Sequence, residues 1–222
     1  DLEAIMPRLN VTGHEGVDRF DGAGALIPEE GGMKILYSAR MPPTRRRWTI
    51  AHELGHAVLF DSSGRNVAGY GPGVERLCDK IACELLMPHK CFAALARVDM
   101  SLGNLLRLAG LFQTSLPATG IRYAEVCGIS VFEMDAVRVL WGAGLVRRTS
   151  DLRTHTALNA LVSPPLRDHS GLERVPLVVG NRAEWWELEW RTINSADRAV
   201  YFLRRAKRMP PSSKRRYIPA QG

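Results

Sequence analysis

The sequence has few cysteines and no long apolar run. It holds four cysteines in 222 residues, and none forms a C-x-x-C pair. We therefore expect free thiols in a reducing compartment, and neither a disulfide framework nor a structural zinc knuckle. No apolar stretch approaches the ~20 residues that span a bilayer, and no charged-then-apolar leader is visible. We expect a cytoplasmic protein without a membrane partner.

Internal repeats and phosphate-cradling glycine loops are also absent. The sequence does carry an excess of positive charge: the formal net charge is +7, and basic residues gather between 198 and 216. A basic balance attracts nucleic acid or acidic proteins without naming a partner. Hydrophobic residues make up 45% of the chain, which is enough to build the core of a globular protein.

The apolar pattern predicts an α+β fold. Residues 23–28 and 33–38 flank "EEGG" and predict a hairpin, whose second strand we expect to be an exposed edge that takes a substrate strand. Helical spacing follows at 44–60 and at 74–86, where Pro88 ends the second helix. Residues 92–126 predict three short helices with a turn near Gly110, which suits either a helix-turn-helix or a small packing bundle.

The later part of the chain predicts further strands. These lie at 128–134, 136–142, 145–148 and between 175 and 206, with one helix at 154–162. We expect a separate α+β module at 127–209 and a basic disordered tail at 210–222.

The segment "AHELGH" carries two histidines four residues apart. On a helix, His52 and His56 share one face, so both imidazoles can bind one metal ion. Glu53 lies about 100° around the helix, where it can take a proton from a metal-activated water. The alternative is an ordinary helix with two surface histidines. The apolar character of the helix argues against it, because partly buried histidines need partners.

The next helix offers a third ligand. A catalytic zinc site takes three protein ligands and leaves a position for water. Glu75 and Asp79 share one face near the start of that helix, so we assign Glu75 as the ligand. Asp79 would accept a hydrogen bond from a ligand histidine and fix its tautomer. Glu84 is the rival, but it lies out of phase within an apolar run. Without the first motif, an acidic helix start favoured by the macrodipole would be the default interpretation.

These residues carry a family resemblance. "RRRWTIAHELGHAVLF" followed by "ERLCDKIACELLMP" resembles the ImmA/IrrE metallopeptidases, which pair an R-x-[WF]-T-[IL]-A-H-E-[LI]-G-H helix with an E-x-x-x-[ND] helix ending in L-M-P. The resemblance is close over residues 33–90 and extends to the IrrE branch, the radiation-response regulators. It implies a zincin-like peptidase domain at 1–91, a helix-turn-helix-like segment at 92–126 and a GAF-like domain at 127–209.

The resemblance also implies a function. Members cleave a helix-turn-helix repressor and so release its target genes, here stress or DNA-damage genes. It implies His52, His56 and Glu75 as ligands of Zn²⁺, with Mn²⁺ as the other metal considered, and Glu53 as the base. Asp79 stands where many members have Asn. The GAF-like domain would take a small-molecule signal.

Two questions stay open at this stage. Some donor should stabilise the oxyanion, and the candidates are Tyr70, His89, Tyr123 and His155, each of which also suits a structural role. The second question is the class of function. The alternative to a peptidase is a DNA-binding or ligand-sensing regulator with a non-catalytic metal site, although few cations lie in the helix-turn-helix-like segment.

Overall fold

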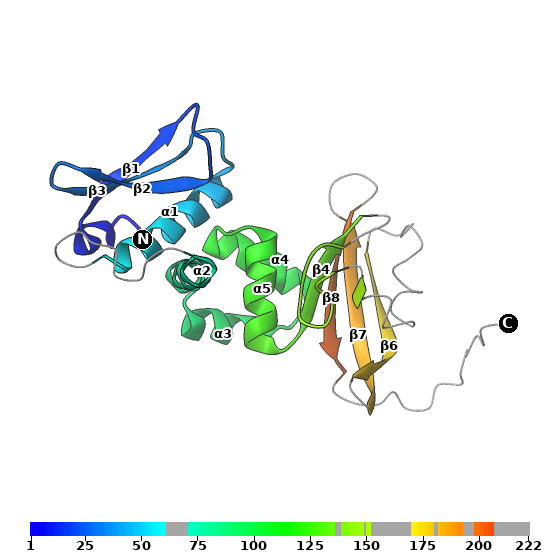
Figure 1. Ribbon diagram of the computed structural model, residues 1–222. Coiled ribbons are helices and arrows are strands. Elements are labelled where there is room, and N and C mark those ends of the chain that lie inside the picture. Colours follow the sequence, from blue (N-terminus) through cyan, green and yellow to red (C-terminus); the bar gives the residue numbers. More distant parts are fainter. Residues whose placement is uncertain are drawn as a thin grey trace, which may run out of the picture. The chain divides into compact units, whose positions relative to one another are not determined.

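The chain forms two compact units, Asp1–Cys127 and Gly128–Gly222, and each is considered by itself (Figure 1). The structure is a computed structural model. It describes residues 1–60, 71–135, 139–148, 150–151, 170–179, 182–192 and 198–206. Together the units have a mixed α+β architecture, as the sequence predicts. All four cysteines are free.

A three-stranded sheet opens the first unit. A short 3₁₀ helix, η1 (Met6–Leu9), precedes β1 (Val11–Val17), which pairs parallel with β3 (Gly32–Ser38). The predicted hairpin is confirmed, since β2 (Gly24–Glu29) pairs antiparallel with β3. The strand order is β1-β3-β2. The prediction that residues 33–38 form an exposed edge is therefore wrong: β3 is central, and β1 and β2 are the edge strands.

Two helices carry the candidate motifs. α1 (Pro43–Val58) begins after Pro42, and α2 (Pro72–Leu86) begins after Gly71 and ends just before Met87 and Pro88. Proline suits the first turn of each helix because its missing N–H has no partner there. The two helices pack closely: a Cβ on Gly55 would lie 2.9 Å from the Cα of Cys78. Glycine at this position brings the histidine face of α1 against α2.

Three short helices complete the first unit. They are α3 (His89–Val98), α4 (Leu102–Phe112) and α5 (Leu116–Cys127). The Ser101 hydroxyl accepts a hydrogen bond from the Asn104 N–H and so caps α4. The predicted turn near Gly110 is misplaced, because α4 continues to Phe112 and ends at Gln113, which adopts a left-handed conformation with φ 52°.

The second unit contains a five-stranded sheet of order β5-β4-β8-β7-β6. Its described pairs are all antiparallel. One apolar cluster includes Phe132, Trp186, Leu188 and Tyr201, so the tryptophan-rich strand contributes to packing. The strands are β4 (Ser130–Met134), β5 (Val139–Ala143), β6 (Ser170–Val179), β7 (Arg182–Thr192) and β8 (Ala199–Arg205).

Some predicted elements differ from the structure or fall outside it. Residues 145–148 form a turn and bends instead of a strand. The predicted helix at 154–162 and the predicted tail at 210–222 lie outside the described residues. Within the described part of the chain, no helix is long and apolar enough to cross a membrane.

Candidate metal centre

Helix α1 places both motif histidines on the side that faces α2. The His52 and His56 ring centroids are 5.0 Å apart, and their side chains are 17% and 15% exposed. Both rings are therefore largely shielded but still reach a common opening. The i, i+4 spacing of the motif accounts for this arrangement.

Glu75, in the first turn of α2, meets both rings. Its carboxylate oxygens lie 3.2 Å from His52 Nε2 and 3.6 Å from His56 Nε2, and one ligand atom from each of the three residues lies within 4.8 Å of the others. Ligands at about 2.1 Å from a tetrahedral ion are roughly 3.4 Å apart. The two nitrogens and the carboxylate thus have nearly the spacing that one metal ion requires.

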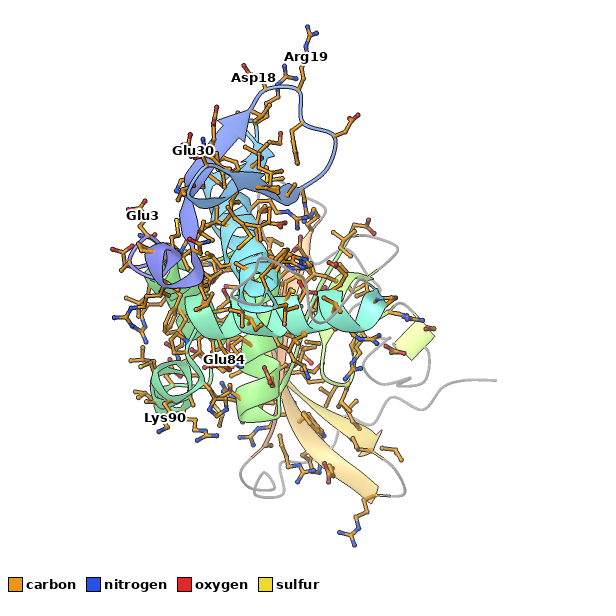
Figure 2. The ribbon with its side chains drawn as sticks, turned by 60° about the vertical axis from the view of Figure 1, so that its left-hand side comes forward. Glu3, Asp18, Arg19, Glu30, Glu84 and Lys90 are labelled. Carbon is orange, nitrogen blue, oxygen red and sulfur yellow. The ribbon has the colours of Figure 1, made fainter. Side chains whose placement is uncertain are left out.

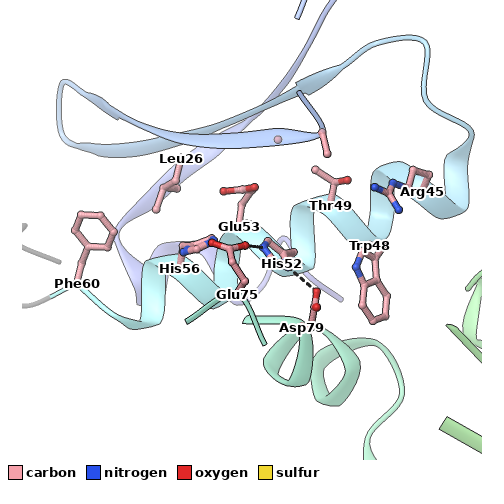
Figure 3. Close-up of a pocket in the computed structure, with 12 residues that line it drawn as sticks. Leu26, Arg45, Trp48, Thr49, His52, Glu53, His56, Phe60, Glu75 and Asp79 are labelled. Carbon is pink, nitrogen blue, oxygen red and sulfur yellow. Dashed lines mark hydrogen bonds and ion pairs between the residues drawn. The ribbon is translucent and has the colours of Figure 1, made fainter. Parts of the chain in front are cut away.

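Asp79 lies one turn further along α2. Its Oδ1 is 3.0 Å from His52 Nδ1, on the opposite side of the ring from the nitrogen that faces Glu75 (Figure 3). An Nδ1–H donated to this carboxylate leaves the Nε2 lone pair available for a metal ion. The contact restrains the orientation of His52, and with a metal ion at Nε2 it would also favour the Nδ1–H tautomer.

Glu53 is the most buried carboxyl group of the site, at 7% exposed. Burial raises its pKa, the His52 charge opposes that shift, and the Glu75 charge adds to it. Burial also lowers the pKa of His56, which favours the neutral imidazole that a metal ion requires. Such shifts, caused by burial and neighbouring charges, are frequent at functional sites.

A pocket of about 460 Å³ surrounds these groups. Figure 3 shows Arg45 and Trp48 at one end, Leu26 and Phe60 at the other, and the histidines between them. Sequence analysis missed these wall residues. Helical spacing from His52 would have indicated Arg45, Trp48 and Thr49, but nothing local in the sequence places β2 over the site. The lining also includes Ala23, Gly24 and Asp79.

The remaining candidates lie elsewhere or are not described. Glu84 of α2, labelled in Figure 2, does not line the pocket. It pairs with Arg122 of α5 and accepts a hydrogen bond from the His89 N–H. His89 is exposed at the start of α3, outside the pocket lining. Tyr123 is fully buried and donates to the carbonyls of Ala96 and Asp99.

The site does not bring His89 and Tyr123 near the pocket, so neither is placed to contact a substrate carbonyl there. Tyr70 and His155, the other two oxyanion candidates, lie outside the described residues. Within the described lining, the side chains that can donate a hydrogen bond include Arg45, Trp48 and Thr49.

An H-E-x-x-H helix that meets a carboxylate from a second helix defines a class, the metal-dependent peptidases. The chain belongs to the family described as "IrrE N-terminal-like domain", whose model matches residues 12–123, about half of the chain. The predicted ImmA/IrrE membership is thereby confirmed.

Two similar proteins extend the comparison. The "Radiation response metalloprotease IrrE" of Deinococcus radiodurans is 36% identical over 78 residues, which is 32% of this chain and 23% of that protein. A solved structure, "Mycobacterium tuberculosis transcriptional regulator", shares 12% identity with a TM-score of 0.54, over 91% of this chain and 68% of that one. At that identity the second comparison shows a similar fold.

Proposed function

We propose that this protein is a zinc-dependent endopeptidase that cleaves a helix-turn-helix transcriptional repressor and so derepresses stress or DNA-damage genes. One observation supports the peptidase most strongly. Two imidazoles and the Glu75 carboxylate converge within 4.8 Å, and the buried Glu53 lines the same pocket. A purely structural metal site has no use for such an additional carboxylate.

The donor set suits Zn²⁺, which takes nitrogen and oxygen ligands in this number and leaves a position open. We assign His52, His56 and Glu75 as the ligands and Asp79 as the residue that orients His52. Mn²⁺ is the second candidate, because it also accepts carboxylate and imidazole ligands. A divalent ion held there supplies a Lewis acid that makes water nucleophilic near neutral pH.

Glu53 would handle the protons of the reaction. Its carboxylate would accept a proton from the attacking water and then deliver that proton to the leaving amine of the cleaved peptide. Its burial and its raised pKa support this role, because a higher pKa lets a carboxyl group accept and return a proton more readily.

The substrate would add a strand to β2, one of the two edge strands of the sheet. Residues of β2 line the pocket beside the histidines, so a peptide hydrogen-bonded to that edge would cross the site. One end of the pocket offers Arg45 and the other offers Leu26 and Phe60 (Figure 3). We infer a substrate with an acidic residue on one side of the scissile bond and an apolar residue on the other.

The repressor as substrate and the finer domain assignments rest on the family resemblance. The α4–α5 pair would be the helix-turn-helix-like segment, and the five-stranded sheet would belong to the GAF-like module that takes a small-molecule signal. The matched region covers 23% of the Deinococcus relative, so what that whole protein does enters here only as part of the proposal.

The alternative function is a DNA-binding regulator, and the contacts of three cations weigh against it. Arg97 donates to the Val126 carbonyl, Arg107 to the Asn104 side chain, and Arg122 to the Met87 carbonyl. Arg97 and Arg122 connect different helices and Arg107 bonds within α4, whereas DNA readout needs cations directed outward at phosphates and bases. These contacts favour the packing-bundle interpretation of residues 92–126.

The decisive experiment incubates the Zn²⁺-loaded protein with helix-turn-helix repressors encoded near its gene. We expect the wild type to cleave one of them, and Glu53→Gln to bind Zn²⁺ but lose cleavage by about 10²–10⁴-fold. Cleavage that survives in Glu53→Gln would refute Glu53 as the base. A gel shift of the repressor's operator by this protein at physiological salt would favour the alternative.

A further inference from the structure

The edge strand approaches the buried carboxyl group of the site at one glycine. Gly24 begins β2 and lines the pocket. A Cβ built on it would lie 2.5 Å from Thr49 Cγ2, 2.7 Å from Glu53 Oε1 and 3.1 Å from Glu53 Cγ. The first two separations are shorter than real Cβ contacts allow. The Glu53 carboxylate therefore rests directly against the backbone of residue 24.

The backbone conformation does not require glycine at this position. Gly24 is not one of the described glycines that have a positive φ, and it pairs regularly with Tyr37 in the sheet. An alanine could adopt the same conformation, so what residue 24 provides is space. The space is filled by two side chains of α1, one of which is the proposed base.

The atoms around Gly24 leave few ways to accommodate a methyl group. Thr49 is buried, and its hydroxyl contacts the Met41 sulfur at 3.7 Å. A β-branched side chain on a helix has one or two accessible rotamers, so its methyl group cannot easily turn away. The end of the Glu53 side chain is freer to move. Figure 3 shows Glu53 directed toward β2, while Glu75 and Asp79 lie on the α2 side.

We propose that Gly24 is a positioning residue for Glu53: the missing side chain lets β2 close over the carboxylate and fixes it beside the metal ligands. The inference rests on the proposed function, because it concerns the geometry of the proposed base. An added Cβ would displace the carboxylate while leaving His52, His56 and Glu75 in place, since its three nearest atoms all belong to Thr49 and Glu53.

The test measures ligand binding in the Co²⁺-loaded protein, with the visible Co²⁺ spectrum as the readout. The probe is acetohydroxamic acid, which chelates the metal and donates its hydroxyl hydrogen to an adjacent carboxylate. We expect Gly24→Ala to bind Co²⁺ with wild-type affinity but acetohydroxamic acid about tenfold more weakly, the loss of one charge-assisted hydrogen bond.

A matched control exists in the same sheet. Gly13 lies in β1, and a Cβ built on it meets nothing within 4 Å. Gly13→Ala removes a strand glycine in the same way, and we expect it to leave both affinities unchanged. A loss of hydroxamate affinity in Gly24→Ala no larger than in Gly13→Ala would overturn the proposal.

Two double variants separate positioning from packing. In a Glu53→Ala background, Gly24→Ala should cause no further loss, because its effect acts through Glu53. Gly24→Ala combined with Thr49→Ser removes the methyl contact, so it should recover thermal stability without recovering hydroxamate affinity. Full recovery of affinity in that pair would assign Gly24 a packing role and overturn the proposal.

Different results would refute this inference and the proposed function. If the wild-type protein binds no Co²⁺ at this site, the proposed function fails and the inference fails with it. If wild type binds Co²⁺ and hydroxamate and Gly24→Ala matches it in both, only the role of Gly24 is overturned.

Discussion

Helix α2 carries a charged cluster near each end, and the two clusters are built differently. Near its C-terminus, Glu84 pairs with Arg122, which is 3% exposed and also bonds Glu125 and the Met87 carbonyl. Near its N-terminus, Glu75 and Asp79 meet two histidines. Among the described residues, no lysine or arginine forms an ion pair with either of these acids.

The difference separates a structural cluster from a candidate functional one. A buried charge is normally neutralised by a partner, as Arg122 is. The N-terminal cluster instead gathers two carboxylates and two imidazoles, the ligand types that the proposed metal ion would bind. The carboxyl groups also shift in opposite directions: burial raises the pKa of Glu53. For Glu84, burial is outweighed by its bonds to Arg122 and the His89 N–H, which lower the pKa.

The largest effect on stability should come from Arg122. Arg122→Met removes the cation from the structural cluster and leaves the Met87 carbonyl without its donor. We expect a loss of about 3 kcal/mol in the free energy of unfolding, measured by urea denaturation. Zn²⁺ affinity of the folded fraction should stay at the wild-type value. A large loss of Zn²⁺ affinity would show that the two clusters are coupled.

The largest effect on metal binding should come from Glu75. Glu75→Gln replaces the carboxylate ligand, and we expect Zn²⁺ affinity to fall by more than 100-fold, beyond the about 10–100-fold typical of outer-shell changes. Glu84→Gln is the matched control on the same helix. Calorimetric titration would measure both, and equal affinities in the two variants would remove Glu75 from the ligand set.

Asp79 should contribute less than Glu75. Asp79→Asn keeps an oxygen that accepts the His52 Nδ1–H but removes its charge, so we expect a loss near the lower end of the about 10–100-fold range for such partners. Asp79→Ala removes the acceptor and should approach the upper end. If Asp79→Ala binds Zn²⁺ as wild type does, the contact with His52 has no role in metal binding.

The opposite pKa shifts predict opposite pH dependences in the metal-free protein. Because the pKa of Glu53 is raised in the folded protein, ionising this group costs more in the folded state than in the unfolded state. Its contribution to stability is therefore lost as pH rises through the folded pKa. At neutral pH, Glu53→Gln should melt above wild type, by about 2–4 °C for each kcal/mol of stability gained. A lowered pKa means that Glu84 adds stability that is lost as pH falls. Glu84→Gln should therefore melt lower than wild type at neutral pH.

Both differences should vanish in acid, where the carboxyl groups are protonated in the folded and unfolded states alike. The Glu84 effect should be the smaller of the two, because its side chain is 53% exposed and solvent screens it. Thermal melting between about pH 2 and about pH 8, which spans the protonation of both carboxyl groups, would measure both. Shifts of the same sign would contradict the contrast between the clusters.

The smallest effect should be on substrate preference. Arg45 is exposed at the charged end of the pocket, and one exposed ion pair contributes about 0.2–1 kcal/mol. Arg45→Gln should lower kcat/KM for substrates with an acidic residue on that side by at most about fivefold and leave neutral ones unchanged. Arg40→Gln, outside the pocket lining, is the control. An equal loss on both substrates would exclude Arg45 from selectivity.

The placement of the motif residues and the β2–β3 hairpin could be predicted from local periodicity. The i, i+4 spacing placed the motif histidines together, and the same spacing aligned Glu75 with Asp79 on α2. The hairpin at β2–β3 followed from alternating apolar residues around a glycine turn. Such patterns depend only on neighbours along the chain, so they are visible without a structure.

The missed features depend on contacts between distant segments. The parallel pairing of β1 with β3 makes β3 the central strand. No local pattern in the sequence specifies that β1 pairs with β3. Gly24 meets Glu53 across 29 positions of sequence, and its role is visible only as a close approach in space. Tyr123 suited an oxyanion role by residue type, but three-dimensional packing buries it among the carbonyls of α3 and the following loop.

The central claim is that His52, His56 and Glu75 hold one metal ion beside Glu53. A crystal structure of the Zn²⁺-loaded protein, with anomalous scattering collected at the zinc edge, tests it directly. We predict a single strong peak within about 2.0–2.2 Å of the two Nε2 atoms and a Glu75 oxygen. A protein that takes up no zinc, or zinc bound elsewhere with this pocket empty, would contradict the account.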